Sequence, residues 1–166
     1  MIIIVFGLPG TGKSFFASRL AEKLKVQYIS SDDVRIAIKA KGKYTFEDKL
    51  SVYHEMAKQT DQSLREKKTV IVDGTFYRHE MRDLFVSLAK IHRTEIRFIE
   101  ITANEKTIKE RLKQPRKKSE ANFEVYQLIK KQFEALDMPR FKIKSDNNNI
   151  EKMLLDALNY LKDADA

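Results

Sequence analysis

The sequence predicts an α/β fold in which a parallel sheet carries helices on both of its faces. Two observations lead to this prediction. Short runs of β-branched and aromatic residues alternate along the chain with amphipathic stretches at helical spacing. In addition, the first of these runs leads through a glycine-rich segment directly into a helical pattern. Such alternation is typical of parallel strands joined by crossover helices, which cover both faces of the sheet.

Five runs predict the strands of this sheet, and each is short and rich in apolar residues. They are Ile2–Phe6, Gln27–Ser30, Thr69–Val72, Glu95–Ile101 and Phe141–Lys144. Ligands of open parallel sheets bind at the carboxyl ends of the strands. Functional residues are therefore expected directly after these runs.

Helices are predicted between the strands, because apolar residues there recur three or four positions apart. The first helix follows the glycine-rich segment and has Phe16, Leu20 and Leu24 on one face. Further helical patterns extend through 50–64, 126–136 and 150–161.

The composition fits a single soluble domain. The chain has 166 residues, of which 42% are hydrophobic and 34% are charged, so one domain over residues 1–166 is expected. The absence of cysteine excludes a disulfide framework and a thiolate metal site, and it fits a reducing cytoplasm. The apolar start, Ile2–Phe6, is too short for a membrane span of about 20 residues and lacks a basic leader. Neither a membrane segment nor a signal peptide is predicted.

The formal net charge of +8 leaves two interpretations open. A lysine-rich surface keeps a protein soluble, whereas a strongly basic domain is also typical of proteins that bind nucleic acid. The phosphates of a bound nucleotide would by themselves occupy several of the cations. Charge alone therefore does not separate a merely soluble surface from one that binds a polyanion.

The glycine-rich segment, GLPGTGKS at residues 7–14, matches the P-loop pattern G-x-x-x-x-G-K-[ST]. Such a loop wraps its backbone N–H groups around phosphate oxygens, and the helix that follows directs its positive end to the same place. Lys13 is expected to reach the β- and γ-phosphates of ATP, and Ser14 to offer its hydroxyl to Mg²⁺. The predicted nucleotide-binding residues are Gly7, Leu8, Pro9, Gly10, Thr11, Gly12, Lys13, Ser14 and Phe15. The alternative is a plain glycine turn, which the preceding strand and the following helix disfavour.

An apolar run, TVIVD, ends in the carboxylate of Asp73, as in the Walker B pattern. If its strand neighbours the first strand, Asp73 would lie beside Ser14 and hold Mg²⁺ directly or through water. The alternative is a turn, because Asp73-Gly74 is a common turn dipeptide. Neither an H-E-x-x-H zinc motif nor an N-K-x-D guanine-reading motif is present.

The stretch SSDDVR ends the second strand and begins a helix. Acidic residues are favourable in the first turn of a helix, and we assign Asp33 to that role. A carboxylate at the end of a strand, opposite the γ-phosphate, can instead accept the proton of an attacking hydroxyl, and Asp32 is the candidate. Arg35 follows three residues later on the same helical face, where it can hold an anionic group of the acceptor.

Together these segments resemble a known family. GLPGTGKS, SSDDVR and VIVDGTFY are similar to the motifs of P-loop kinases that include the phage-type 5′-polynucleotide kinase domain and predicted AAA-type ATP-binding kinases, with zeta-toxin-like and gluconate kinases as more distant relatives. The resemblance covers nearly the whole chain, including the late FEALDMP stretch. It implies a P-loop NTPase fold, with a five-stranded parallel sheet of the nucleoside-kinase type and a short mobile lid. The same resemblance makes Asp32 the general base, Arg35 a ligand of an acceptor phosphate and Asp73 an acid that organises the site.

The lid is expected at residues 113–121 (KQPRKKSEA), where Pro115 should end the preceding helix. The resemblance implies that lid arginines contact the transferred phosphate. Arg111 and Arg116 fall in the matching segment, and both remain candidates. The adenine is expected near the lid and the loop 145–149.

The sequence thus predicts an ATP- and Mg²⁺-dependent cytoplasmic kinase that transfers the γ-phosphoryl group to a hydroxyl. The favoured acceptor is the 5′-OH of DNA or RNA, because basic residues and two tyrosines lie in the acceptor half of the chain. These residues are Arg35, Lys39, Lys41, Lys43, Arg78, Arg82, Tyr44 and Tyr77. A kinase of a sugar, nucleoside or antibiotic is the alternative. A third possibility is a P-loop ATPase switch that drives a partner protein without phosphorylating an acceptor.

Overall fold

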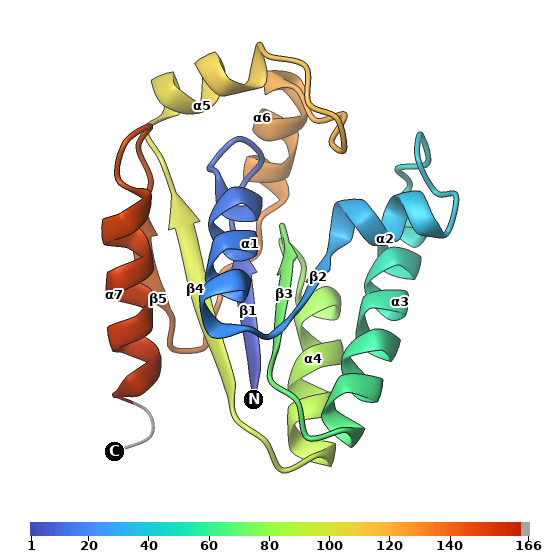
Figure 1. Ribbon diagram of the computed structural model, residues 1–166. Helices are drawn as coiled ribbons and strands as arrows, with labels where there is room; N and C mark the ends of the chain where they lie inside the picture. Colours follow the sequence, from blue (N-terminus) through green and yellow to red (C-terminus); the bar gives the residue numbers. More distant parts are fainter. Residues whose placement is uncertain (164–166) are drawn as a thin grey trace.

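The predicted strands pair into one sheet in the order β2-β3-β1-β4-β5 in the computed structural model, which describes residues 1–163 (Figure 1). The parallel strands are β1 (Ile2–Phe6), β2 (Gln27–Ser30), β3 (Val70–Gly74), β4 (Ile96–Thr102) and β5 (Phe141–Lys144). This arrangement confirms the predicted α/β fold and places the first strand at the centre, between β3 and β4. Residues 164–166, which the expected domain included, lie outside the described residues.

The helices lie on both faces of the sheet and above the carboxyl ends of its strands (Figure 1). They are α1 (Lys13–Leu24), α2 (Ser31–Ala37), α3 (Phe46–Arg65), α4 (His79–Ile91), α5 (Glu105–Leu112), α6 (Phe123–Gln132) and α7 (Ile150–Lys162). α1 and α7 cover one face, and α3 and α4 cover the other. α5 and α6 flank the expected lid above the strand ends.

The central strand, β1, contributes residues to both hydrophobic cores of the molecule. Every residue of β1 is buried, which is why its sequence, IIIVF, is apolar throughout rather than alternating. Ile4 belongs to the core under α3 and α4, together with Met56. Ile3 belongs to the core under α1 and α7, together with Met153. The strand is therefore held from both sides, and the loop that follows it starts from a rigid position.

The third strand is longer at its carboxyl end than expected. The interpretation of Asp73-Gly74 as a turn is wrong, because β3 continues through both residues and pairs them with Val5 and Phe6 of β1. A side chain at Gly74 would place its Cβ only 2.6 Å from the Tyr53 hydroxyl, so the strand end requires glycine for close packing. Asp73 is thereby held in the sheet, directly beside the strand that leads into the P-loop.

The late helix is shorter than expected, since α6 ends at Gln132 and the chain is extended from Phe133 onward. Arg82 of α4 accounts for this difference. Its guanidinium is buried and donates hydrogen bonds to the carbonyls of Phe76, Glu134 and Ala135. The expectation that Arg82 contacts a nucleic acid is therefore wrong, because its donors are used to tie the segment after α6 to the end of β3.

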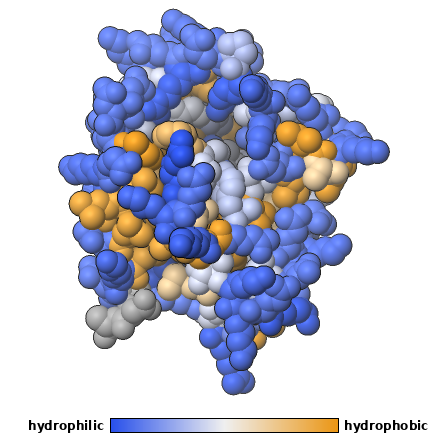
Figure 2. Space-filling model, viewed as in Figure 1, coloured by the Kyte–Doolittle hydropathy of each residue, from blue (hydrophilic) through white to orange (hydrophobic). Residues whose placement is uncertain are grey.

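The outer surface is mostly hydrophilic on the face shown in Figure 2, with exposed apolar residues over α7 and near α2. The large apolar residues with exposed side chains include Leu155 of α7, which is 58% exposed, and Ile36 and Ile38 at the end of α2. Between Met1 and Asp163, no helix combines the length and the apolar character that crossing a membrane requires.

Replacing Arg82 with methionine should lower the free energy of unfolding by about 3 kcal/mol or more, because several buried carbonyls would lose a charged donor. Urea denaturation of the ligand-free protein measures this change. Lys90→Met, at an exposed position on the same helix, is the matched control and should change stability by less than about 0.5 kcal/mol. Equal stability of the two variants would contradict the structural role of Arg82.

Candidate active site

The P-loop connects β1 to α1, and its glycines allow neighbouring segments to pack closely against its backbone. A Cβ on Gly7 would lie 2.4 Å from the backbone oxygen of Ile101, which cannot move aside. Gly12 caps α1 in the left-handed region, with φ of 86°, where only glycine is unstrained. The Thr11 hydroxyl donates to the Leu8 carbonyl at 2.9 Å and stabilises the loop from within. The loop and the start of α1, from Gly10 to Phe16, line a cavity, which is where a phosphate bound by backbone N–H groups would lie.

Asp73 lies at the carboxyl end of β3 with its carboxylate buried. Its Oδ2 accepts a hydrogen bond from the Tyr28 hydroxyl at 2.8 Å, whereas Oδ1 has no hydrogen-bond partner among the described residues. Burial raises the pKa of Asp73, and the nearby Lys13, Ser14 and Tyr28 act in the opposite direction. An unpartnered buried carboxylate oxygen beside a serine hydroxyl suits a hard cation such as Mg²⁺ or its bound water.

Tyr28 is a site residue that sequence reasoning missed. Burial and the Asp73 carboxylate raise the pKa of the Tyr28 hydroxyl far above its usual range, so it remains a hydrogen-bond donor. It pairs with Ile71 across the sheet, and only the order β2-β3-β1 brings its hydroxyl to Asp73. The one sequence feature that could have indicated this role is a tyrosine in a strand that leads to the site. Tyrosine is common in strands, so this feature alone does not identify a site residue.

Lys13 is the charged centre of the site. Burial lowers the pKa of its ammonium group, whereas the carboxylates of Asp73 and Asp32 raise that pKa. The Arg116 guanidinium opposes protonation of Lys13 from the lid side. The structure therefore brings together four predicted site residues, which come from α1, α2, β3 and the lid.

The first turn of α2 separates the two candidate carboxylates. Asp33 forms an ion pair with Lys118 of the lid at 2.7 Å, so it does more than begin the helix. Asp32 instead lines a cavity beside Lys13. One turn further along α2, Arg35 lines the same cavity. The two acids therefore face different surroundings although they are adjacent in sequence.

Two cavities meet at the P-loop. The larger one, of about 500 Å³, lies between the loop, α5 and the start of α7. The smaller one, of about 280 Å³, lies between α2, α3 and the lid. Lys13, Ser14 and Arg116 line both cavities. A phosphate held by these residues would therefore be in contact with both spaces.

The two lid arginines are in different places. Arg111 donates hydrogen bonds to the Gly10 carbonyl at 3.2 Å, to the Ser145 hydroxyl at 3.1 Å and to the Asn147 side chain at 3.2 Å. These contacts hold Arg111 at the wall of the larger cavity, next to the loop 145–149. Arg116 is free of these contacts and lies where the two cavities meet.

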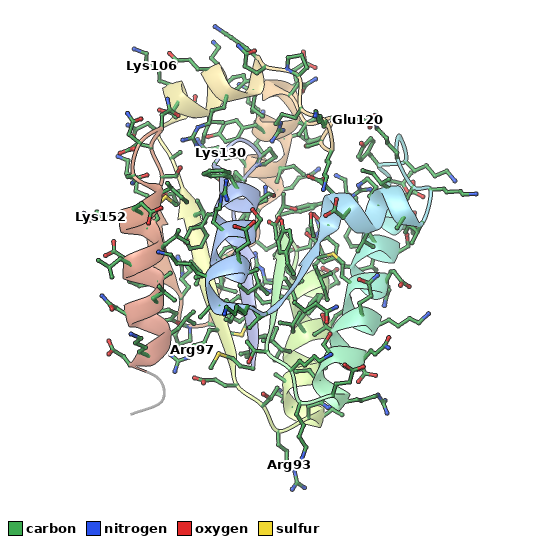
Figure 3. All side chains as sticks on the ribbon, viewed as in Figure 1. Arg93, Arg97, Lys106, Glu120, Lys130 and Lys152 are labelled. Carbon is green, nitrogen blue, oxygen red and sulfur yellow. The ribbon has the colours of Figure 1, made fainter. Side chains whose placement is uncertain are left out.

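The segment expected as the lid, residues 113–121, lines the smaller cavity and contacts α2 and the loop after it. The Glu120 carboxylate accepts a hydrogen bond from the Tyr44 hydroxyl and lies 4.0 Å from the Lys41 ammonium. Figure 3 labels Glu120 at the lid, on the side that faces α2. Together with the Asp33–Lys118 pair, these contacts connect the lid to the opposite wall of the cavity.

The other residues that the sequence predicted for the site have different surroundings in the structure. Leu8 packs its side chain against the core, so its part in the loop is its backbone. Phe15 is 56% exposed and borders the larger cavity, whereas Pro9 borders the smaller one. The Arg78 guanidinium forms an ion pair with the Glu134 carboxylate at 2.9 Å. The sequence had assigned this arginine to acceptor binding, and its charge is instead paired within the protein.

Curated relatives of the chain include proteins described as uncharacterised. Proteins of Mycobacterium bovis (strain ATCC BAA-935 / AF2122/97) and Mycobacterium tuberculosis (strain ATCC 25618 / H37Rv) are 33% identical over 93 residues. The match includes 49% of this chain but 19% of each relative, so the chain spans about a fifth of the length of these proteins.

Solved structures share the fold over nearly their whole length. A sugar kinase of Janibacter sp. HTCC2649 has a TM-score of 0.73 at 21% identity, over 97% of this chain and 94% of that one. A gluconokinase of Sinorhizobium meliloti 1021 gives 0.70 at 18% identity, over 96% and 91%. The APS kinase of Mycobacterium tuberculosis gives 0.74 at 14% identity, over 97% and 96%. At identities this low, the structural similarity establishes the fold alone. That fold is the one of the P-loop kinases.

Family membership follows from the sequence. A family model described as an AAA domain matches residues 2–136, which is most of the chain. The protein therefore belongs to this AAA domain family, and its fold is that of the P-loop kinases.

Proposed function

We propose that the protein is an ATP- and Mg²⁺-dependent kinase that phosphorylates a hydroxyl group of a small acceptor molecule. The observation that carries this proposal is the pair of cavities that share Lys13, Ser14 and Arg116. The larger cavity would hold the nucleotide and the smaller one the acceptor. Phosphoryl transfer needs the donor and the attacking oxygen in line on opposite sides of one phosphate, and this arrangement offers such a path.

The nucleotide would bind with its phosphates on the P-loop N–H groups and its base beside the loop 145–149. Arg111 would border the base side of the larger cavity, where Ser145 and Asn147 hold its guanidinium in place. Ser14 and Asp73 would hold Mg²⁺, with Tyr28 orienting the Asp73 carboxylate. When bound, Mg²⁺ neutralises phosphate charge and orients the terminal phosphates.

In the transfer step, the acceptor hydroxyl oxygen forms a bond to the γ-phosphorus as the bond to the β–γ bridging oxygen breaks. The hydroxyl proton passes to the Asp32 carboxylate, and ADP leaves with the bridging oxygen. Lys13 and Arg116 stabilise the negative charge on the transferred group from two sides. Each role uses a residue at the junction of the two cavities.

A small acceptor is favoured over a polynucleotide. The acceptor cavity is only about 280 Å³ and is covered by the lid. Arg82 and Arg78, which the sequence assigned to nucleic-acid contacts, are engaged within the protein. The neighbours named as sugar kinase, gluconokinase and APS kinase support a small acceptor as well. The 5′-OH of DNA or RNA remains an outcome of the test.

An ATPase switch without an acceptor is the other candidate. The acceptor-side cavity and the position of Asp32 within it argue against this function. The test is to supply γ-labelled ATP and Mg²⁺ with a panel of sugars, sugar acids, nucleosides and 5′-OH oligonucleotides. The kinase proposal expects label on at least one small compound. ATP hydrolysis with no labelled product from any acceptor would contradict it.

Asp32→Asn should lower kcat for transfer by about 10²–10⁴-fold, because the variant has no general base, while the Kd for ATP stays within about twofold. Asp33→Asn is the matched control, since it removes the neighbouring charge and loosens only the pair with Lys118. Its loss of kcat should be below about tenfold. A larger loss in Asp33→Asn than in Asp32→Asn would show that the base is assigned to the wrong carboxylate.

Asp73→Asn should remove the part of ADP binding that depends on Mg²⁺, because the buried Oδ1 would lose its charge. The measurement is the melting temperature with ADP alone and with ADP and Mg²⁺. In the wild type and in Asp83→Asn, an exposed acid on α4, Mg²⁺ should raise the melting temperature further. An unchanged Mg²⁺ effect in Asp73→Asn would exclude this residue from the metal site.

The two lid arginines should respond differently to substitution by methionine. Arg111→Met should weaken ADP binding by about tenfold, because this arginine borders only the nucleotide cavity. Arg116→Met should leave ADP binding within about twofold but lower kcat by about 10³-fold, since its contact is with the transferred phosphate. Isothermal titration with ADP and steady-state kinetics separate the two effects. The reverse ranking would contradict the assignment.

A further inference from the structure

The two carboxylate oxygens of Asp73 have different surroundings. Oδ2 accepts a hydrogen bond from the Tyr28 hydroxyl at 2.8 Å, whereas Oδ1 has no partner among the described residues. Lys13, Ser14 and Asp32 also act on the charge of this carboxylate, and they approach it from α1 and α2. One oxygen is therefore engaged within the sheet before any ligand binds, and the other is not.

Tyr28 is held in place by the sheet and by the core beneath α1. Its ring packs against that core, which also contains Ile71, its partner on β3. Two residues further along the strands, β2 pairs with Asp73, so the Tyr28 and Asp73 side chains lie on the same face of the sheet. β2 is the edge strand next to β3, on the side away from β1 (Figure 1). The hydroxyl therefore reaches Asp73 from the side opposite to the strand that leads into the P-loop.

The hydrogen bond limits how a cation can use this carboxylate. A cation that binds both oxygens of Asp73 would have to displace the Tyr28 hydroxyl from Oδ2, whereas a cation that uses Oδ1 alone would leave the bond intact. Mg²⁺ demands a small octahedral shell and keeps several of its waters, so one carboxylate oxygen is enough for it. Ca²⁺ is larger, takes more oxygens and often binds both oxygens of one carboxylate. The two ions therefore respond differently to a carboxylate that is held by a tyrosine.

We propose that Tyr28 is a positioning residue that sets the cation selectivity of the nucleotide site, because it restricts Asp73 to one oxygen for the metal and so favours Mg²⁺ over Ca²⁺. This inference rests on the proposed function, which assigns the metal of the bound nucleotide to Ser14 and Asp73. Without the Tyr28 hydroxyl, the Asp73 carboxylate is free to turn and to offer both of its oxygens.

A purely structural role for Tyr28 makes a different prediction. The hydroxyl would then only satisfy a buried carboxylate, and its loss would lower stability and weaken Mg²⁺ and Ca²⁺ binding alike. The ratio of the two affinities therefore separates the two roles, whereas stability alone does not.

The test compares two tyrosines that each donate a hydrogen bond to an acid. Tyr28→Phe removes the hydroxyl at Asp73 and keeps the ring in the core. Tyr126→Phe is the matched control, because the Tyr126 hydroxyl donates to the Glu105 carboxylate at 3.3 Å and this tyrosine lines neither of the two cavities. Melting temperatures, and the Kd for ADP without a divalent cation, report whether the fold and the P-loop of each variant are intact.

The first measurement is the Kd for ADP by isothermal titration, with either Mg²⁺ or Ca²⁺ present at a concentration that saturates the nucleotide. We expect the wild type and Tyr126→Phe to bind ADP at least about tenfold more tightly with Mg²⁺ than with Ca²⁺. In Tyr28→Phe the two values should come within about threefold of each other, mainly because binding with Ca²⁺ becomes tighter. Equal binding with both ions in the wild type, or an unchanged ratio in Tyr28→Phe, would overturn the inference.

The second measurement adds Tyr28→Phe to Asp73→Asn. Because Tyr28 acts through the Asp73 carboxylate, the ratio of the two Kd values should be the same in Asp73→Asn with and without the tyrosine hydroxyl. A further change of the ratio in the double variant would show that Tyr28 acts elsewhere, and it would overturn the inference.

Failure of the proposed function gives other results. If neither ion changes ADP binding by the wild type, the proposed metal site and the role of Tyr28 both fail. If the ratios behave as expected but labelled ATP phosphorylates no acceptor, the kinase proposal fails, and Tyr28 remains the residue that selects the cation of the bound nucleotide.

Discussion

The site depends on one constraint, which is that the carboxyl ends of β1 and β3 lie side by side in the sheet. This pairing places the buried Asp73 next to the strand that enters the P-loop, where its charge faces Lys13. Burial disfavours both charges, and each partly compensates the other. Such a pair is stable only where rigid neighbours hold it, and the two cores on either side of β1 supply that rigidity.

The order of the strands determines where the other charged and polar residues of the site lie relative to Asp73 and Lys13. The order β2-β3-β1 brings Tyr28 and the start of α2 to one side, and so places Asp32 near Lys13. The lid approaches from above and adds Arg116 at the junction of the two cavities. Two cavities that share their charged residues therefore result from the fold itself.

The sequence predicted the fold and the centre of this arrangement because both depend on local patterns. Three of five strands have the expected bounds, and the P-loop spacing located Lys13 and Ser14. Sequence reasoning failed where distant segments decide the outcome. Tyr28 reaches its partner only through strand order. Arg82 looked like a surface cation, although two of its three partner carbonyls lie 52 and 53 positions away, which no side-chain pattern reveals.

We infer that a nucleotide and an acceptor occupy opposite sides of one phosphate site, because two cavities meet at Lys13, Ser14 and Arg116. The most direct measurement is a crystal structure with a non-hydrolysable ATP analogue and Mg²⁺. We expect the base beside Asn147 and Arg111, and the γ-phosphate between Lys13 and Arg116, with its far side open to the cavity that contains Asp32. A nucleotide with its base in the cavity of Asp32, or a γ-phosphate directed away from that carboxylate, would contradict it.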